Sequence, residues 1–595
     1  MLNSSYGELE RACRSRLSAE NDSELLRGWL PPSQASIELI STGLDAEASL
    51  KDAGSIEARA AVASAFEAVC KAWEQLDAVF RAFFGPPLSQ TLLLKPISLR
   101  HPFLFYLGHL PAFAWNRYHS LLQPQHSLAV SSSLTMDELL SFGKLFERGM
   151  DPDVDDPSQC HWHSQVPEAV EDWPSVSKVA AYRDYIRQDL FHRVQQWCYA
   201  PHSSSPPANE CFTLLRTIAE HEWMHTETLL YMVHQLDALS KAPLQAQTHP
   251  WKRQSAADSS PNDCDQRGFM PLIGTFVSIE TEEIASLGRN PEEKCPHAFQ
   301  FAWDNEMPQV QRTIPRRLLV QEYPVTNSQF LNFVKDGGYR DLHRYWLDES
   351  DRLWCAKNSR QCPQFWRAIH RPDRASDTLA FHVVHLDGRL SKHSIGDPAC
   401  TENNWPVYIS LAEARAYANW VCVKARHAQS REIGWRLPTE AEWQYIADGA
   451  YPKTSTGDGN SDSAMDGNHG FRHWGPIDTY QSPNSSRWNV RDLVGNGWEW
   501  TDTPFQPLDP DRFQPTPLYP EYSADFFDQK HFVLKGASWA TGAPLIRPTF
   551  RNWYQAHYPY VFAKFRLVCD VSPVELSDRS AAVRNEAPCS HDASG

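Results

Sequence analysis

Apolar residues recur at helical spacing in several stretches of the N-terminal part of the chain. The clearest runs from Ser55 to Phe84, where one apolar face is followed by Gly85-Pro86-Pro87. The same spacing predicts helices from Phe103 to Tyr118, from Val176 to Trp197 and from about Ala208 to Leu239. These stretches together predict a bundle of about four or more helices.

The pattern changes after residue 268. Short runs such as Thr275 to Ile279 and Arg317 to Glu322 predict strands, and a helix is expected from Leu411 to Arg426. Helices followed by strands indicate an α+β, multidomain chain. We expect an N-terminal extension (1–29), a helical bundle (30–245), a polar linker (246–268), a mixed domain (269–575) and a disordered tail (576–595).

Composition excludes several classes of function. A chain of 595 residues exceeds one core, so about two or three domains are expected. The net charge of −17 argues against general binding to nucleic acid or to anionic membranes. No apolar run reaches the roughly 18 residues of a membrane span, and the N-terminus lacks a secretory pattern. The 13 cysteines form no C-x-x-C pair, which indicates reduced thiols in the cytoplasm.

The segment from Arg216 to Tyr231 carries the strongest chemical signal. It contains no Gly or Pro, and it places His221 and His225 four residues apart, on one face of a helix. Two such imidazoles can chelate a transition metal, although paired histidines also occur on ordinary helices. His109 lies in the apolar run of another predicted helix, as a core residue or as a third ligand.

Two kinds of metal site fit this pattern. As H-E-x-x-H, the segment is typical of zinc peptidases, with Glu222 as the general base. Alternatively, His109, His221 and His225 are three neutral ligands of Fe(II), which leaves positions for oxygen and a substrate. Glu227 lies about 200° around the helix from His225, which suits a packing partner better than a ligand.

A second, weaker candidate for a metal site is the group Cys160, His161 and His163. It follows an acidic segment, Phe146 to Asp156, whose alternating aspartates are similar to a calcium loop. Pro152 interrupts that segment and no Gly-then-Glu pattern follows, so we expect an ordinary loop there.

Several phrases occur together with the histidine motif. They are Arg436-Leu-Pro-Thr-Glu-Ala-Glu-Trp443, Gly495-Asn-Gly-Trp-Glu-Trp-Thr501 and Arg551-Asn-Trp553. In this combination the chain, over about residues 30 to 575, resembles the ergothioneine-biosynthesis sulfoxide synthases. These are nonhaem-iron enzymes with a DinB-like helical bundle followed by a formylglycine-generating-enzyme-like (C-type-lectin-like) mixed domain. The phrases around Leu99 to His109 and Glu147 to Asp153 look most like the iron-dependent half of the fungal enzymes.

The resemblance implies a ligand set and a reaction. It implies Fe(II) on His109, His221 and His225, and it implies that Asn552 and Trp553 form walls of the pocket for hercynine, which is trimethylhistidine. The implied reaction uses O2 to join the thiol of cysteine to the imidazole C2 of hercynine, giving hercynylcysteine sulfoxide. Aromatic faces suit a trimethylammonium group, and this half of the chain is rich in Trp and Tyr.

The resemblance also implies a catalytic tyrosine pair, Tyr519 and Tyr522. A phenol with a pKa near 10 remains protonated at neutral pH and can deliver a proton, and Tyr519 is the preferred catalytic phenol. A loop tyrosine packed on the surface is the alternative interpretation of Tyr519. Arg148 is a candidate partner for a substrate carboxylate.

This chain differs from the bacterial pattern at three positions. Tyr554 and Tyr558 stand where glutamylcysteine-using members carry an acidic residue and an arginine, which favours free cysteine as the sulfur donor. Met224 stands where bacterial members carry Gln on the imidazole side of the substrate. The sequence shows no glycine-rich nucleotide loop, so a separate methyltransferase is expected to supply hercynine.

Other functions remain open from the sequence. Within the family, these are an ovothiol-type enzyme with histidine as acceptor, or a selenoneine-type enzyme with a selenium donor; Asn552 and Trp553 favour hercynine. Formylglycine generation requires a cysteine pair, and beyond Cys422 only Cys569 and Cys589 remain. A binding module without catalytic activity is the last alternative.

Overall fold

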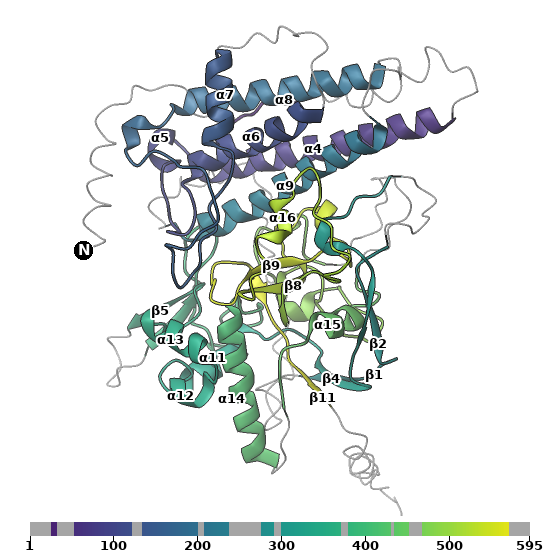
Figure 1. Cartoon of the computed structure of the whole chain (residues 1–595). Coiled ribbons are helices and arrows are strands. Elements are labelled where there is room, and N and C mark those ends of the chain that lie inside the picture. Colours follow the sequence, from purple (N-terminus) through teal and green to yellow (C-terminus); the bar gives the residue numbers. More distant parts are fainter. Residues whose placement is uncertain are drawn as a thin grey trace, which may run out of the picture.

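The structure is a computed structural model that describes residues 25–31, 53–121, 134–199, 207–236, 275–290, 299–370, 379–429, 434–451 and 467–570. The predicted linker and tail, and almost all of the predicted N-terminal extension, lie outside these ranges. Figure 1 shows a layer of helices above a mixed region of strands and short helices, with helix α9 between them.

The helical part contains the predicted long helices. Its elements are α4 (Ala53–Phe83), α5 (Leu88–Thr91), α6 (Phe103–Leu121), α7 (Met136–Leu145), α8 (Val176–Tyr199) and α9 (Ala208–His234). Helix α9 packs against α4 and α6, and α6 packs against α7 and α8. None of the described helices is both long and apolar enough to cross a membrane.

Four sheets organise the C-terminal half. The largest has the order β10-β7-β8-β9, from β10 (Ala563–Lys564), β7 (Gly497–Pro504), β8 (His531–Ala537) and β9 (Asn552–Gln555). A second has the order β1-β4-β11, from β1 (Phe276–Glu280), β4 (Arg317–Gln321) and β11 (Val568–Asp570). Two antiparallel pairs join β2 (Ile284–Leu287) to β3 (Val310–Thr313) and β5 (Trp366–His370) to β6 (Leu379–Val383).

The predicted helix that begins at Leu411 is confirmed, but the sequence did not predict the other helices of this half. Besides α14 (Leu411–Gln429), the structure contains α11 (Asn327–Lys335), α12 (Leu342–Tyr345), α13 (Glu349–Lys357), α15 (Glu440–Ile446) and α16 (Glu521–Ala524). Unlike α14, the other five helices are too short to show a periodic apolar face. Two of them begin with capping boxes, Thr326 with Gln329 and Thr439 with Glu442, which are readable in the sequence.

The three phrases of the C-terminal half that the sequence analysis singled out (436–443, 495–501 and 551–553) are linked by buried hydrogen bonds and ion pairs. Arg551 donates to Glu440 over 2.7 and 3.0 Å, and the Trp443 indole donates to Glu499 over 2.8 Å. Arg566 donates to the same Glu499 carboxylate over 2.6 and 2.8 Å. All of these groups are buried. The charged residues of these phrases therefore build a frame that fixes the start of β9.

A buried ion network joins the two halves. Arg547 donates to both oxygens of Glu220 on α9, each over 3.0 Å, and its Nε donates to Glu306 over 2.9 Å. The Trp303 indole donates to Glu220 over 2.8 Å. Both glutamates are fully buried. Because such carboxylates are costly to bury without partners, this network holds α9 against the C-terminal half.

Candidate metal centre and substrate pocket

Three histidines converge at the junction of the two halves. His109 comes from α6, and His221 and His225 come from successive turns of α9. One ring nitrogen from each lies within 4.8 Å of those of the others. The ring centroids are 5.2 Å apart for His109 and His221, 4.9 Å for His109 and His225, and 4.5 Å for the α9 pair. The sequence-predicted ligands are therefore together in space.

Neighbouring groups fix the orientation of the imidazoles. Nδ1 of His109 lies 2.7 Å from the backbone carbonyl oxygen of Phe146. A carbonyl only accepts, so Nδ1 carries the proton and Nε2 keeps a lone pair for a metal. The ring of His221 stacks on Phe113 with centroids 3.6 Å apart and an interplanar angle of 11°.

These histidines fit a divalent transition metal. Burial lowers the pKa of His109 to about 4, and it lowers the pKa values of His221 and His225 well below the ordinary value. All three are therefore neutral at pH 7, with lone pairs available. The Nδ1 atoms of His221 and His225 are buried and bond no other protein atom. A set of three neutral imidazoles suits iron, zinc or a related ion.

The other candidate ligands do not converge. In the described part of the chain, Cys160, His161 and His163 do not come together as a group of possible ligands, so the structure does not support this weaker candidate. His163 lies 3.0 Å from the Ser164 carbonyl oxygen, and His161 packs edge-on against Phe526. The three residues belong to a segment without helix or strand.

Glu222 lies on the far side of α9. Its Oε1 accepts a hydrogen bond from the Trp73 indole over 3.3 Å, and Arg187 is nearby. Burial raises the pKa of Glu222 to about 7. A general base for a peptidase has to face the substrate beside the metal. The position of Glu222 inside the bundle does not support that role.

Glu227 bonds to the C-terminal half instead of joining the histidines. It accepts hydrogen bonds from Trp498 over 2.8 Å, from Ser538 over 2.6 Å and from Thr541 over 2.9 Å. Its carboxylate is thus satisfied by neutral donors from that half. Glu227 is a packing partner, as its place on the helix predicts.

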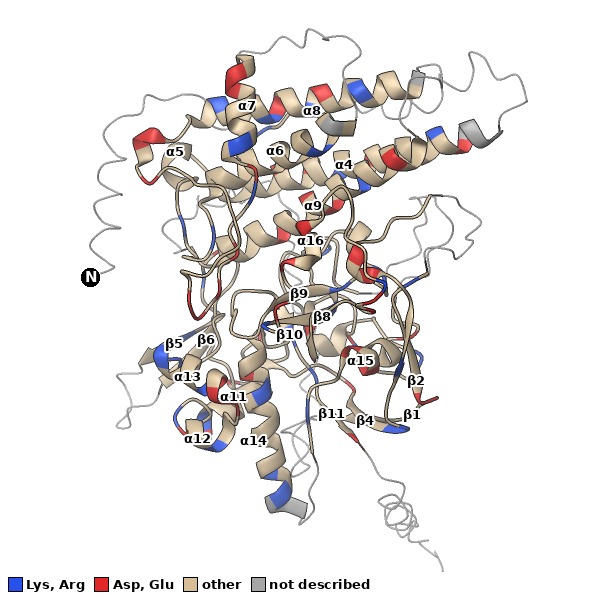
Figure 2. Ribbon diagram, in the orientation of Figure 1, with Lys and Arg blue, Asp and Glu red and all other residues tan. Residues whose placement is uncertain are grey.

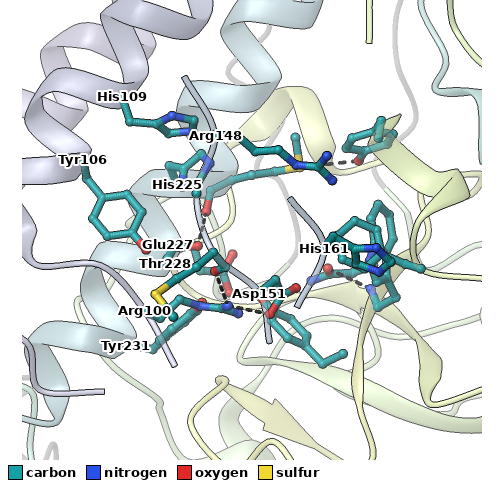
Figure 3. A pocket seen from close by; sticks show the side chains of 18 of the residues that line it. Arg100, Tyr106, His109, Arg148, Asp151, His161, His225, Glu227, Thr228 and Tyr231 are labelled. Carbon is teal, nitrogen blue, oxygen red and sulfur yellow. Dashed lines mark hydrogen bonds and ion pairs between the residues drawn. The ribbon is translucent and has the colours of Figure 1, made fainter. Parts of the chain in front are cut away.

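A cavity of about 200 Å³ opens beside the histidines (Figure 3). Both halves of the chain line it. Of the residues predicted from the sequence, it brings together His109, Arg148, Met224, His225, Tyr519, Tyr522, Asn552, Trp553 and Tyr554. His221 completes the histidine group beside it.

The two predicted tyrosines lie at the metal end of the cavity. The Tyr519 ring is 6.2 Å from that of His221 and 5.1 Å from that of Phe113, and the Arg117 guanidinium lies 4.8 Å above it. Burial raises the pKa of Tyr519 to about 12, so its phenol is protonated at neutral pH. The Tyr522 hydroxyl points to Met224, 3.5 Å from its sulfur.

Aromatic side chains form another wall of the cavity. Trp553 stacks on Phe505 with centroids 4.3 Å apart, and its ring lies 5.1 Å from Tyr522 and 5.6 Å from Phe526. The Trp553 amide donates to the side-chain oxygen of Asn552 over 2.9 Å. This wall offers several π faces around one end of the cavity.

Sequence reasoning missed a polar cluster at the opposite side. Arg100 donates to Asp151 over 2.5 Å and to the Tyr231 hydroxyl over 3.3 Å, and it lies 5.0 Å above the ring of Tyr558. Figure 3 shows Arg100, Asp151 and Tyr231 together below the histidines. Arg100 and Asp151 occur in the two phrases quoted for the fungal resemblance. The signal in the sequence that could have indicated this cluster was Arg100, a charged residue in the mostly apolar phrase from Leu99 to His109.

The predicted arginine is also engaged with the protein. Arg148 lines the cavity and pairs with Asp525, which follows α16. Tyr554 stacks on Tyr558 with centroids 5.6 Å apart and an interplanar angle of 5°. Two arginines, Arg100 and Arg148, therefore line the cavity, and each is paired with an aspartate.

Comparison with known proteins agrees with this fold. The sulfatase-modifying factor enzyme 1-like domain matches residues 284–571. Over 268 residues the chain is 30% identical to an inactive C-alpha-formylglycine-generating enzyme 2 of Mus musculus, covering 40% of this chain and 68% of that relative. The chain belongs to the sulfatase-modifying factor enzyme 1-like family. The predicted fold class, a helical region followed by a domain of this family, is confirmed.

Two further relatives were found, and the match to the first of them extends beyond that domain. The chain is 28% identical over 570 residues to ergothioneine biosynthesis protein 1 of Neurospora crassa, covering 84% of this chain and 57% of the relative. It is 30% identical over 289 residues to hercynine oxygenase of Mycolicibacterium smegmatis, covering 46% of this chain and 57% of that relative. The resemblance to ergothioneine-biosynthesis enzymes is confirmed, and the chain spans little more than half of each relative.

Proposed function

We propose that this protein is an Fe(II)- and O2-dependent sulfoxide synthase of ergothioneine biosynthesis. In the proposed reaction, hercynine loses the hydrogen on its imidazole C2 and cysteine loses its thiol hydrogen. A carbon–sulfur bond forms, one oxygen atom of O2 becomes the sulfoxide oxygen, and the other leaves as water. The observation that carries the proposal is the group of three neutral histidines opening onto an aromatic cavity that contains Tyr519.

The histidine group would hold the metal. His109, His221 and His225 supply three nitrogen donors, and the cavity beside them has space for substrates. Iron bound there would supply the activation of dioxygen and the oxidation of sulfur. The protein's own part is to keep the three imidazoles neutral and oriented, which burial, Phe146 and Phe113 do.

The aromatic wall is our proposed site for the trimethylammonium group of hercynine. Trp553, Tyr522 and Phe526 present rings on that side of the cavity, and a quaternary cation is attracted to such faces. Asn552 adds a side-chain amide at the start of β9. A substrate anchored there places its imidazole toward the histidine group.

Tyr519 is our proposed proton donor. Its ring lies beside His221, and its raised pKa keeps the hydroxyl hydrogen in place at neutral pH. A positioned phenol can transfer that proton when negative charge develops on the reacting oxygen. Arg117, above the ring, favours the negative phenolate that would follow proton transfer.

Free cysteine is the proposed sulfur donor. Tyr554 and Tyr558 stack on each other near Arg100, at the two positions where glutamylcysteine-using enzymes carry an acidic residue and an arginine, and Arg100 is itself paired with Asp151. A short donor fits this aromatic end better than a dipeptide. Arg100 and Arg148 are the candidates to meet substrate carboxylates, in competition with Asp151 and Asp525.

Three further points belong to this proposal: the source of hercynine, the location of the reaction and the class of substrate. Hercynine has three N-methyl groups, so a methyltransferase has to supply it from histidine. We place the reaction in the cytoplasm, a choice that the cysteines support, because every cysteine in the described ranges is free. Figure 2 shows Lys and Arg interspersed with Asp and Glu over both halves, which suits small-molecule substrates better than nucleic acid.

Oxygen consumption with a substrate panel tests the proposal. The protein is loaded with Fe(II) without air and mixed with aerated hercynine and cysteine. Oxygen uptake coupled to the formation of hercynylcysteine sulfoxide is expected. Little product should form when histidine replaces hercynine or when glutamylcysteine replaces cysteine. The His221→Ala variant should consume no oxygen. Preferred use of histidine or of glutamylcysteine would contradict the substrate assignment.

A further inference from the structure

One wall of the cavity is a long segment without helix or strand. Residues 148–162, here called the pocket loop, supply Arg148, Asp151, His161 and Trp162 to the cavity. Trp162, although it lines the cavity, is 62% exposed to solvent. A segment of this kind lines a substrate site reproducibly only if other elements fix its backbone.

Gln555 fixes the backbone of the pocket loop. Its side-chain oxygen accepts from the Val154 amide over 2.8 Å, and its side-chain nitrogen donates to the Pro152 carbonyl over 2.9 Å. Gln555 is buried and ends β9, the strand that also carries Asn552 and Trp553. The loop wall and the aromatic wall are thereby tied to each other.

His557 fixes the loop a second time, through a side chain. Its Nδ1 lies 2.7 Å from Asp155 of the loop, and its Nε2 lies 2.9 Å from Asp351 of α13. The imidazole is 6% exposed and stacks on Trp354 with centroids 5.2 Å apart. The ring therefore bridges the loop to a helix of the C-terminal half.

This bridge requires a charged histidine. Carboxylates only accept, so both imidazole nitrogens have to donate, which only the protonated ring can do. Burial lowers the pKa of His557, but the hydrogen bonds and charges of Asp351 and Asp155 outweigh it, and the net pKa is raised. Three further charged groups lie at the bridge. Arg415 is 3.7 Å from Asp351, and Lys357 donates to the Asp155 carbonyl over 2.9 Å. Lys530 pairs with Asp153 of the loop, and its charge also acts on Asp155.

We propose that His557, together with Gln555, is a positioning residue that holds the pocket loop in its substrate-binding position. For its substrates the proposal rests on the function proposed above, whereas the loop contacts stand without it. Because the pKa of His557 is raised in the folded protein, the bridge stabilises the loop fully below about pH 6.5, the unfolded value. That contribution is lost as the pH rises through the folded pKa.

Hydrogen exchange of residues 148–162, measured at several pH values, tests the bridge without any substrate. In the wild type, exchange should accelerate as the pH rises, beyond the intrinsic pH dependence of exchange. In His557→Phe, which keeps a ring against Trp354, protection should be low at every pH. Asp155→Asn is a milder change, because that side chain is half-exposed, and it should also lower the exchange protection of the loop. Equal loop protection in wild type and both variants would overturn the proposal.

The matched control is His385→Phe. His385 also pairs with a carboxylate, Glu402, at 3.0 Å, and packs edge-on against Trp405, but it touches no part of the pocket loop. This variant should leave loop exchange unchanged. A loss of loop protection equal to that of His557→Phe would show a general effect of removing a histidine–carboxylate contact and would overturn the assignment.

Kinetics then separates positioning from a purely structural role. In His557→Phe the KM should rise about tenfold while kcat changes less than about threefold, with unchanged Fe(II) binding. The KM of the wild type should also rise with pH. A loosened loop with an unaltered KM would contradict the positioning role. If no sulfoxide is formed even by the wild type, the proposed function fails while the exchange data still decide the loop contacts.

Discussion

The indole of Trp73 on α4 donates to Oε1 of Glu222 over 3.3 Å, so the residue that directly follows His221 faces the interior of the bundle. The H-E-x-x-H pattern is therefore divided between two sides of α9. The two histidines face the cavity side with His109, while the glutamate is enclosed among helices. The same five residues in a zinc peptidase need all three side chains at the metal.

The variant Glu222→Gln therefore distinguishes a zinc peptidase, in which Glu222 is the general base, from a three-histidine metal enzyme, in which Glu222 only packs inside the bundle. The amide keeps the shape of the side chain and an acceptor for Trp73, so sulfoxide formation should fall less than about threefold. Stability should change little because Arg187 keeps its bonds to Asp77 of 2.7 and 3.0 Å. Steady-state rates of the purified variant check this prediction. Loss of all activity with iron still bound would indicate that Glu222 acts in the reaction.

Each of the three histidines should be needed for metal binding. His109→Ala, His221→Ala and His225→Ala each remove one of three donors, and Fe(II) affinity should fall by more than about a hundredfold. Anaerobic titration with Fe(II) measures this directly. His192→Ala on α8 is the matched control and should bind like the wild type, because His192 lies 3.3 Å from Gln195 and packs on Phe191, away from the histidine group. Tight binding by His109→Ala would remove His109 from the ligand set.

Tyr519→Phe should uncouple oxygen use from carbon–sulfur bond formation. The ring contacts with Phe113 and Arg117 are kept, and only the hydroxyl group with its proton is lost. Sulfoxide formation should fall about 10²–10⁴-fold, with oxidised cysteine becoming the main product. Tyr522→Phe, whose hydroxyl meets only a thioether at 3.5 Å, should have a smaller effect. Chromatography of the products checks both variants, and equal losses would contradict the choice of Tyr519.

The junction of the two halves should depend on Arg547. Arg547→Met leaves buried Glu306 without its cation and leaves Glu220 with Arg216 alone, 2.9 Å away, and the expected destabilisation is about 3–5 kcal/mol. Arg316→Met is the control, since Arg316 pairs with Glu283 while 83% exposed, and it should cost less than about 1 kcal/mol. Thermal unfolding of both variants compares the two. Equal melting temperatures would show that the network is not required for stability.

Much of the fold is readable from the sequence because long helices display their apolar faces. The helices from Ala53 to Phe83 and from Ala208 to His234 lie close to their predicted positions. Short helices such as Glu440–Ile446 have no such face, and only their caps identify them. The pocket loop has neither signal, because Gln555 and His557 fix it from positions about 400 residues further along the chain.

The histidine group shows the same division. The four-residue spacing predicts that His221 and His225 share a face, but no spacing relates them to His109, which comes from another helix. The sequence pattern left His109 as either a core residue or a third ligand, and the resemblance to a family implied that it is a ligand. The cluster of Arg100, Asp151 and Tyr231 was missed because its members come from three separate segments that only folding brings together.

The most direct measurement of the central claim is the mass of the product formed under heavy-isotope oxygen gas. Protein loaded with Fe(II) is incubated with hercynine and cysteine, and the product is analysed by mass spectrometry. We predict a product with the combined mass of both substrates, less two hydrogen atoms, plus one heavy oxygen atom, and its absence in His221→Ala. Oxidised cysteine together with unchanged hercynine in the wild type would contradict the proposed function.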